Sequence, residues 1–156
     1  RLPLSVLIDS ATARHRQEEI QYLVKVNEKR NINEQPLVVS SPEIIHGIGN
    51  IIQNATQFAK SRVTTLIDWD AVHIWISIFD DGPGFPVGLL ERLGEPYVSS
   101  RRGIGGHMGL GVFIATILLR RSGAKISYLN RSEGGAMVEL VWRRGWLEEP
   151  IAEENF

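Results

Sequence analysis

The pattern of apolar and polar positions along the chain predicts alternating helices and strands. Helical spacing of apolar residues occurs in four segments, 4–17, 42–59, 87–93 and 110–121. Runs rich in β-branched and aromatic residues favour strands over 22–26, 37–39, 63–67, 72–79, 125–129 and 137–142. We expect Asp68, Trp69 and Asp70 to form the hairpin turn between two of these strands. This order of elements predicts an α+β sandwich with helices on one face of the sheet.

Composition and charge exclude several classes of protein. The chain has 156 residues, of which 17 are basic and 18 acidic, so no overall field favours nucleic acid or an anionic membrane. It has no cysteine, which excludes disulfides, thiolate metal sites and a cysteine nucleophile within this sequence. The longest mostly apolar run, 110–119, has ten residues, whereas a membrane span needs about twenty. Because the sequence opens with Arg1 and shows no signal peptide, we expect one soluble domain over 1–156, cut from a longer protein.

The helix predicted over 42–59 has two faces of different chemistry. One face is apolar and is expected to pack in the core: Ile44, Ile48, Ile51, Ile52, Ala55, Phe58 and Ala59. The other is polar but uncharged: His46, Asn50, Gln53, Asn54 and Gln57. Exposed helix faces favour Lys, Glu and Arg, and Asn is a poor helix former. Two interpretations stay open, a solvent-exposed face built of amides and a row of amides that faces a polar ligand. Amide oxygens would suit Mg²⁺ shared with phosphates.

Two glycine-containing segments follow this helix. Asp80 opens the sequence Asp-Asp-Gly-Pro-Gly directly after a predicted strand. These are ordinary turn residues, but a carboxylate at a strand end can also accept a hydrogen bond from the amino group of a ligand. The segment 99–111 has glycines at 103, 105, 106, 109 and 111, and the last ones open a helix whose free N–H groups favour phosphate oxygens. The chain has no G-x-x-x-x-G-K-[ST] P-loop, and Met108 stands where a dinucleotide-binding fingerprint requires glycine.

Taken in order, these motifs resemble the ATP-binding catalytic domain of sensor histidine kinases, within the GHKL group that includes Hsp90, MutL and the type II topoisomerases. Residues 50–55, Asn-Ile-Ile-Gln-Asn-Ala, resemble the N box of that family. Residues 80–84 resemble its first glycine box, 107–112 its second, and 95–97 its aromatic F box. Details of 54–59 and 93–98 are most similar to the RegB/PrrB/ActS redox-responsive kinases. The resemblance implies the Bergerat fold, a two-layer α/β sandwich with a mixed, mostly antiparallel sheet and about three helices on one face.

The resemblance also implies roles for the residues that match the N box and first glycine box. Asn54 would be a Mg²⁺ ligand, and Asn50, at the catalytic position, would orient the phosphates or their water. Asp80 would accept a hydrogen bond from the adenine amino group. Gly82 and Gly84 would let the backbone pass beside the base.

Further roles are implied for the lid and the segments around it. Gly109 and Gly111 would present N–H groups to the phosphates from a movable lid that also includes Met108 and Leu110. Tyr97 would line the nucleotide site, and Phe58 would either pack on the purine or belong to the core. Gln57 stands where the family usually has Lys or Arg, so Arg101, Arg102 or Lys60 would replace that phosphate contact. His107 replaces the first glycine of the second glycine box.

The function that the resemblance implies is protein histidine kinase activity of the EC 2.7.13.3 type. The chain would bind ATP with Mg²⁺ and donate the γ-phosphate to a histidine on a partner dimerisation domain, for transfer to a response regulator. None of the histidines of this chain has the sequence context of the acceptor, so we expect no autophosphorylation by the chain alone. Alternatives are a nucleotide-dependent switch and a Ser/Thr anti-sigma-type kinase. We expect a cytoplasmic domain, without direct membrane insertion, of an inner-membrane-anchored bacterial sensor kinase.

Overall fold

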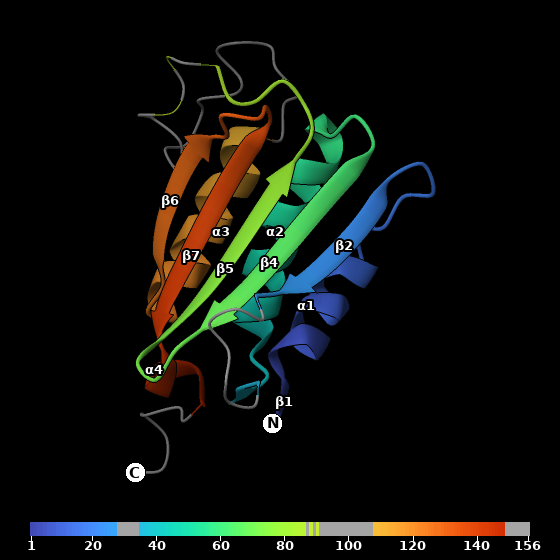
Figure 1. The fold of residues 1–156 in the computed structure, drawn as a ribbon. Helices are drawn as coiled ribbons and strands as arrows, with labels where there is room; N and C mark the ends of the chain where they lie inside the picture. Colours follow the sequence, from blue (N-terminus) through green and yellow to red (C-terminus); the bar gives the residue numbers. More distant parts are fainter. Residues whose placement is uncertain (28–34, 87, 89, 91–107, 149–156) are drawn as a thin grey trace.

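A five-stranded sheet in the order β2-β4-β5-β7-β6 forms one layer of the fold in the computed structural model (Figure 1). The model describes residues 1–27, 35–86, 88, 90 and 108–148, and only the backbone of 108–110. The strands are β2 (Gln21–Val26), β4 (Arg62–Trp69), β5 (His73–Asp80), β6 (Lys125–Asn130) and β7 (Ala136–Arg143). β2 pairs with β4 in parallel, and the other neighbours are antiparallel. The prediction of a mixed, mostly antiparallel sheet is therefore confirmed. A small second sheet joins β1 (Leu2–Pro3) to β3 (Leu37–Val38).

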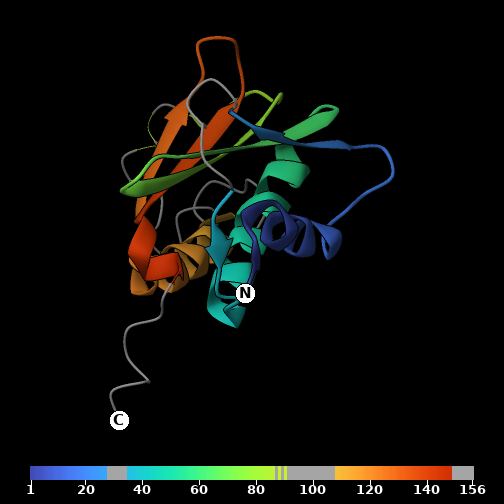
Figure 2. The same cartoon turned by 60° about the horizontal axis from the view of Figure 1, so that its bottom comes forward.

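Three helices form the second layer, all on one face of the large sheet (Figure 2). They are α1 (Leu4–Ala13), α2 (Pro42–Phe58) and α3 (Met108–Arg121), and a short α4 (Arg144–Glu148) follows β7. α2 packs against both α1 and α3. The two-layer sandwich with helices on one face is confirmed. Within the residues that the structure describes, no helix is both long and apolar enough to cross a bilayer.

The core lies between these layers and follows from the period of each element. Alternate residues of β5, Ile74, Ile76 and Ile78, are buried toward the helices, where they meet the apolar face of α2. Burial of each such side chain contributes about 1.5–3 kcal/mol. α2 and α3 approach closely because Gly47 has no side chain: a Cβ atom there would lie 2.7 Å from Cγ of Leu119. This contact holds the C-terminal end of α3 against the N-terminal half of α2.

The structure corrects two of the predicted boundaries. The hairpin turn predicted at Asp68, Trp69 and Asp70 is wrong, because β4 continues to Trp69 and the turn lies between Trp69 and His73. The carboxylate of Asp70 closes that turn by accepting from the backbone N–H groups of Val72 and His73, at 2.8 and 2.7 Å. α1 ends at Ala13, not at residue 17. The chain then turns toward β2, where the Tyr22 hydroxyl donates to the carbonyl of His15 at 3.1 Å. Most of the helix expected over 87–93 lies outside the described residues.

Candidate functional site

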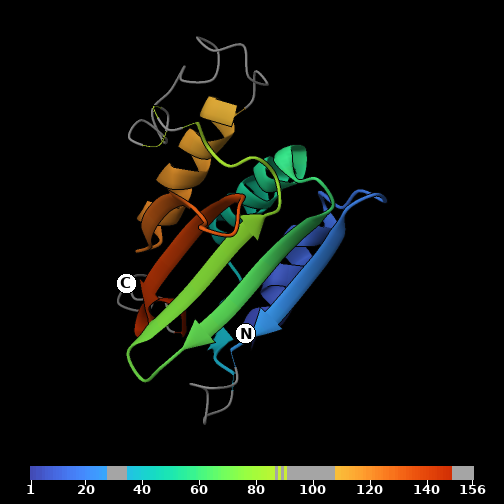
Figure 3. The same cartoon turned by 45° about the horizontal axis from the view of Figure 1, so that its top comes forward.

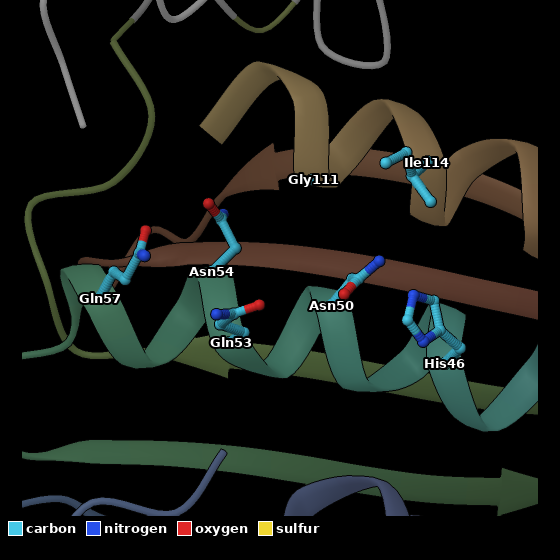
Figure 4. Close-up of a pocket in the computed structure, with 7 residues that line it drawn as sticks. All are labelled: His46, Asn50, Gln53, Asn54, Gln57, Gly111 and Ile114. Atoms are coloured by element: carbon cyan, nitrogen blue, oxygen red, sulfur yellow. The ribbon is translucent and has the colours of Figure 1, made fainter. Parts of the chain in front are cut away.

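The polar face of α2 lines a cavity of about 270 Å³ between α2 and α3 (Figure 4). The cavity is lined by His46, Asn50, Gln53, Asn54, Gln57, Gly111 and Ile114. Asn50 and Asn54 are half-buried, whereas Gln53 and Gln57 are exposed. In the described part of the chain, none of these five polar side chains of α2 has a hydrogen-bond partner. A solvent-exposed face of amides, the first interpretation, therefore accounts for Gln53 and Gln57. Asn50 and Asn54 instead face the cavity, and their amide groups have no hydrogen-bond partner among the described residues.

The segment after β5 lies against the C-terminal end of α2. A Cβ atom on Gly82 would come within 2.0 Å of the Phe58 carbonyl oxygen, so only glycine fits there without a backbone shift. On the other side, a Cβ atom on Gly135 would lie 1.9 Å from the Asp80 carbonyl oxygen, and Gly135 has φ +94. Asp80 is thereby held at the end of the molecule where α2 and β5 finish and α3 begins (Figure 3). Asp80, Gly82 and Gly84 do not line the α2 cavity and lie beyond its Gln57 end.

The two neighbouring aspartates have different environments. Asp81 accepts from the backbone N–H of Lys60 at 2.8 Å, of Ser61 at 3.0 Å and of Arg62 at 3.2 Å, and from the Ser61 hydroxyl at 2.7 Å. Partial burial opposes ionisation of Asp81, but these hydrogen bonds outweigh it and lower its pKa to about 2. The carboxyl oxygens of Asp81 are therefore used within the chain, where they fix the connection between α2 and β4.

Asp80, in contrast, is buried with few partners. The residue is only 5% exposed, and its side chain accepts from the backbone N–H of Gly82 at 2.8 Å. Burial raises the pKa of Asp80 above its usual value, although the N–H groups of Gly82 and Ala136 oppose the shift. A carboxylate has about four acceptor positions. Asp80 thus keeps acceptor capacity for a donor from outside the chain, which Asp81 does not.

Asn130 anchors the same segment, and sequence reasoning missed this role. Its side-chain oxygen accepts from the Phe85 N–H at 2.7 Å, and its amide donates to the Phe85 carbonyl at 2.8 Å. Gly84, with φ +87, fits beside it, because a Cβ atom there would lie 2.8 Å from the Asn130 oxygen. The two partners are 45 residues apart in the sequence, so no local pattern signals the pair.

The remaining candidates differ in where they lie and in how far the structure describes them. Phe58 is half-buried and packs against the core cluster, as one of its two predicted roles requires. Gly111 lines the α2 cavity, and a Cβ atom there would meet nothing within 4 Å. Met108, Gly109 and Leu110 form the start of α3, of which only the backbone is described. Tyr97, Arg101, Arg102 and His107 lie outside the described residues.

Comparison with known proteins defines the class to which this fold and site belong. Residues 40–145 match the family described as histidine kinase-, DNA gyrase B-, and HSP90-like ATPase. The chain belongs to this family, which confirms the resemblance drawn from the motifs. Sensor histidine kinase RegB from Cereibacter sphaeroides is 41% identical over 128 residues, which are 69% of this chain and 28% of RegB. Sensor histidine kinase GtrS from Pseudomonas aeruginosa is 37% identical over 102 residues, 65% of this chain and 21% of GtrS.

Solved structures show the same fold at lower sequence identity. The catalytic domain of histidine kinase ThkA superposes with a TM-score of 0.73 at 20% identity, covering 92% of this chain and 95% of that one. The mycobacterial sensor histidine kinase MprB superposes with a TM-score of 0.71 at 21% identity, covering 91% and 96%. The similarity to RegB agrees with the subfamily indicated by residues 54–59 and 93–98. The chain spans little more than a quarter of the length of RegB.

Proposed function

We propose that this chain is the catalytic domain of a longer sensor kinase, which binds ATP with Mg²⁺ and transfers the γ-phosphate to a histidine of a partner dimerisation domain. The observation that carries the proposal is the pair of half-buried amides, Asn50 and Asn54, which face α3 across the α2 cavity. Neither amide has a hydrogen-bond partner among the described residues. Family membership supplies ATP as the ligand. A response regulator then receives the phosphoryl group.

Three parts of the site together orient the nucleotide: Asp80, the polar face of α2 and the N-terminal turn of α3. Asp80 accepts from the adenine amino group, since it is buried and keeps acceptor capacity. The phosphates extend along the polar face of α2 toward Asn50. The N-terminal turn of α3, which includes no acidic residue, offers N–H groups to phosphate oxygens. Gly111 faces the cavity there with open space around its Cα atom.

The donor chemistry of the cavity fits Mg²⁺. Mg²⁺ prefers oxygen ligands and keeps several waters, so one protein amide oxygen would be enough beside phosphate oxygens and waters. Asn54 provides that oxygen. No group of three or more His, Cys, Asp or Glu side chains is arranged for a metal within the described residues, so a site for a more tightly bound metal is not seen there. When bound, Mg²⁺ would neutralise the negative charge of the phosphates.

Transfer itself requires positioning rather than an acid or base on α2. An imidazole nitrogen of the acceptor histidine attacks the γ-phosphorus, the bond from that phosphorus to the β–γ bridging oxygen breaks, ADP leaves, and the proton on the other imidazole nitrogen passes to solvent. Asn50 is an amide and does not activate water as a carboxylate would, which disfavours hydrolysis in place of transfer. We propose that the acceptor lies outside this chain and that the domain is cytoplasmic, with the stimulus and the membrane anchor in other parts of the kinase.

The test mixes the chain with a separately produced histidine-bearing dimerisation domain and ATP labelled at the γ-phosphate. We expect label on the dimerisation domain that is lost in acid and kept in alkali, as phosphohistidine requires, and no label on the chain alone. Acid-stable label on the partner would favour the Ser/Thr kinase. Release of labelled phosphate without any labelled protein would favour a nucleotide-dependent switch.

A further inference from the structure

His46 continues the row of polar side chains on α2 beyond Asn50. It lies one turn before Asn50, and Figure 4 shows its imidazole on the same face of the helix, toward α3. The side chain is exposed and has no hydrogen-bond partner in the part of the chain that is described. The row therefore ends in a donor that is available to a ligand.

His46 stands where two cavities meet. It lines the α2 cavity with Asn50 and Asn54, and it also lines a second cavity of about 410 Å³ that reaches Arg14 and Leu118. Asp80 and Gly82 lie at the opposite end of the row, next to Phe58. The His46 end is therefore the end farthest from the adenine in the orientation proposed above.

Two basic side chains, His46 and Arg14, line the second cavity at this end of the row. Burial lowers the pKa of His15, and the nearby His46 and Arg14 lower it further, so these three side chains lie within electrostatic reach of one another. Glu43, which also lines the second cavity, pairs with Arg121 at 3.8 Å. With Glu43 paired to Arg121, Arg14 is a positive side chain that lines the second cavity together with His46.

The reach of the side chains agrees with a phosphate between Asn54 and His46. Two turns of helix separate the two residues, which is about 12 Å along the axis. A triphosphate that starts near Asn54 and extends along this face would bring its terminal phosphate toward His46.

We propose that the imidazole of His46 donates a hydrogen bond to the terminal phosphate of bound ATP, and that His46 thereby distinguishes ATP from ADP. The proposal rests on the function proposed above and adds a substrate-contacting residue to it. ADP lacks the group that His46 contacts, so the residue stabilises the complex with ATP alone.

The experiment measures the affinity of the 156-residue chain for ATP and for ADP by titration calorimetry with Mg²⁺ present. We expect His46→Ala to weaken ATP binding about tenfold, the loss of a hydrogen bond to a charged group, while ADP affinity stays within about twofold. His46→Gln, whose amide N–H₂ can replace the imidazole N–H, should restore most of the preference. His73→Ala is the matched control, because His73 contacts Trp75 in β5, with tilted rings whose centroids are 5.5 Å apart, and does not line either cavity.

Parallel weakening of ATP and ADP by His46→Ala would show a structural role and overturn the inference, as would no change in either affinity. Retained ADP binding also reports that the variant is folded. In the wild-type chain, imidazole NMR signals of His46 should shift with ATP and not with ADP, and equal shifts would count against the contact. Failure of the wild-type chain to bind either nucleotide would overturn the proposed function itself, which is a different result from an unchanged ATP preference.

Discussion

Gly82 lies so close to Phe58 that a Cβ atom on the glycine would come within 2.0 Å of the phenylalanine carbonyl oxygen. This contact joins the end of α2 to the segment after β5, and so it sets the position of Asp80 relative to the amide row. The same backbone approach determines both local stability and the geometry of the candidate site.

Replacement of Gly82 by alanine should therefore destabilise the fold. The neighbouring atom is backbone and cannot rotate away, so we expect Gly82→Ala to lower the free energy of unfolding by about 2 kcal/mol or more. Urea denaturation followed by circular dichroism measures this. Gly88→Ala is the control, because a Cβ atom there meets nothing within 4 Å. Equal stability of the two variants would contradict the close contact.

Asp81 should contribute stability that disappears in acid. Its folded pKa of about 2 is below the ordinary value of 3.8, so its contribution is complete above about pH 4 and is lost as the pH falls toward 2. Because the side chain is partly exposed, solvent screening reduces the contribution to about 1 kcal/mol. Asp81→Asn should show that loss at pH 7 and almost none near pH 2. The exposed Asp9→Asn serves as control, and a pH-independent difference would show that ionisation of Asp81 is not the cause.

Asp80, unlike Asp81, should matter for nucleotide binding and not for the stability of the fold. A raised pKa means that the charged carboxylate is disfavoured in the folded chain, so at pH 7 Asp80→Asn should leave the free energy of unfolding unchanged or raise it. The same substitution replaces the acceptor proposed for adenine. ATP affinity should fall at least about tenfold, the loss expected for a charged hydrogen bond, and the difference between ATP and GTP should narrow. Unchanged discrimination between the two nucleotides would remove Asp80 from the site.

Asn54 should account for the part of ATP affinity that depends on Mg²⁺. We expect Asn54→Ala to abolish most of the gain in ATP affinity on addition of Mg²⁺, because its amide oxygen is the protein ligand proposed above for the metal. Affinity measured in EDTA should change little and is the internal control. If the variant retains the full Mg²⁺-dependent gain, the metal is bound elsewhere.

The polar and apolar faces of α2 could be predicted because helix periodicity is a local property. Residues three or four positions apart share a face whatever the rest of the chain does, so the buried Ile48 and Ile52 and the half-buried Asn50 and Asn54 were assigned to their faces correctly. The hairpin turn predicted at Asp68 was wrong, because residues that are common in turns, such as Asp, also occur inside strands. There, antiparallel pairing of Asp68 with Trp75 in β5 overrides the local preference.

What the sequence determined alone was the family, the order of elements and the chemistry of each motif, since all three depend on residues that are near one another in the chain. Tertiary structure decided which of two adjacent aspartates has its carboxyl oxygens occupied by hydrogen bonds within the chain and which keeps acceptor capacity. It also paired Asn130 with Phe85, 45 residues away, and brought Gly111 and His46 to one cavity. These relations depend on how β5, β7 and the helices pack, and the free energy of that packing comes from contacts distant in sequence, which no local pattern records.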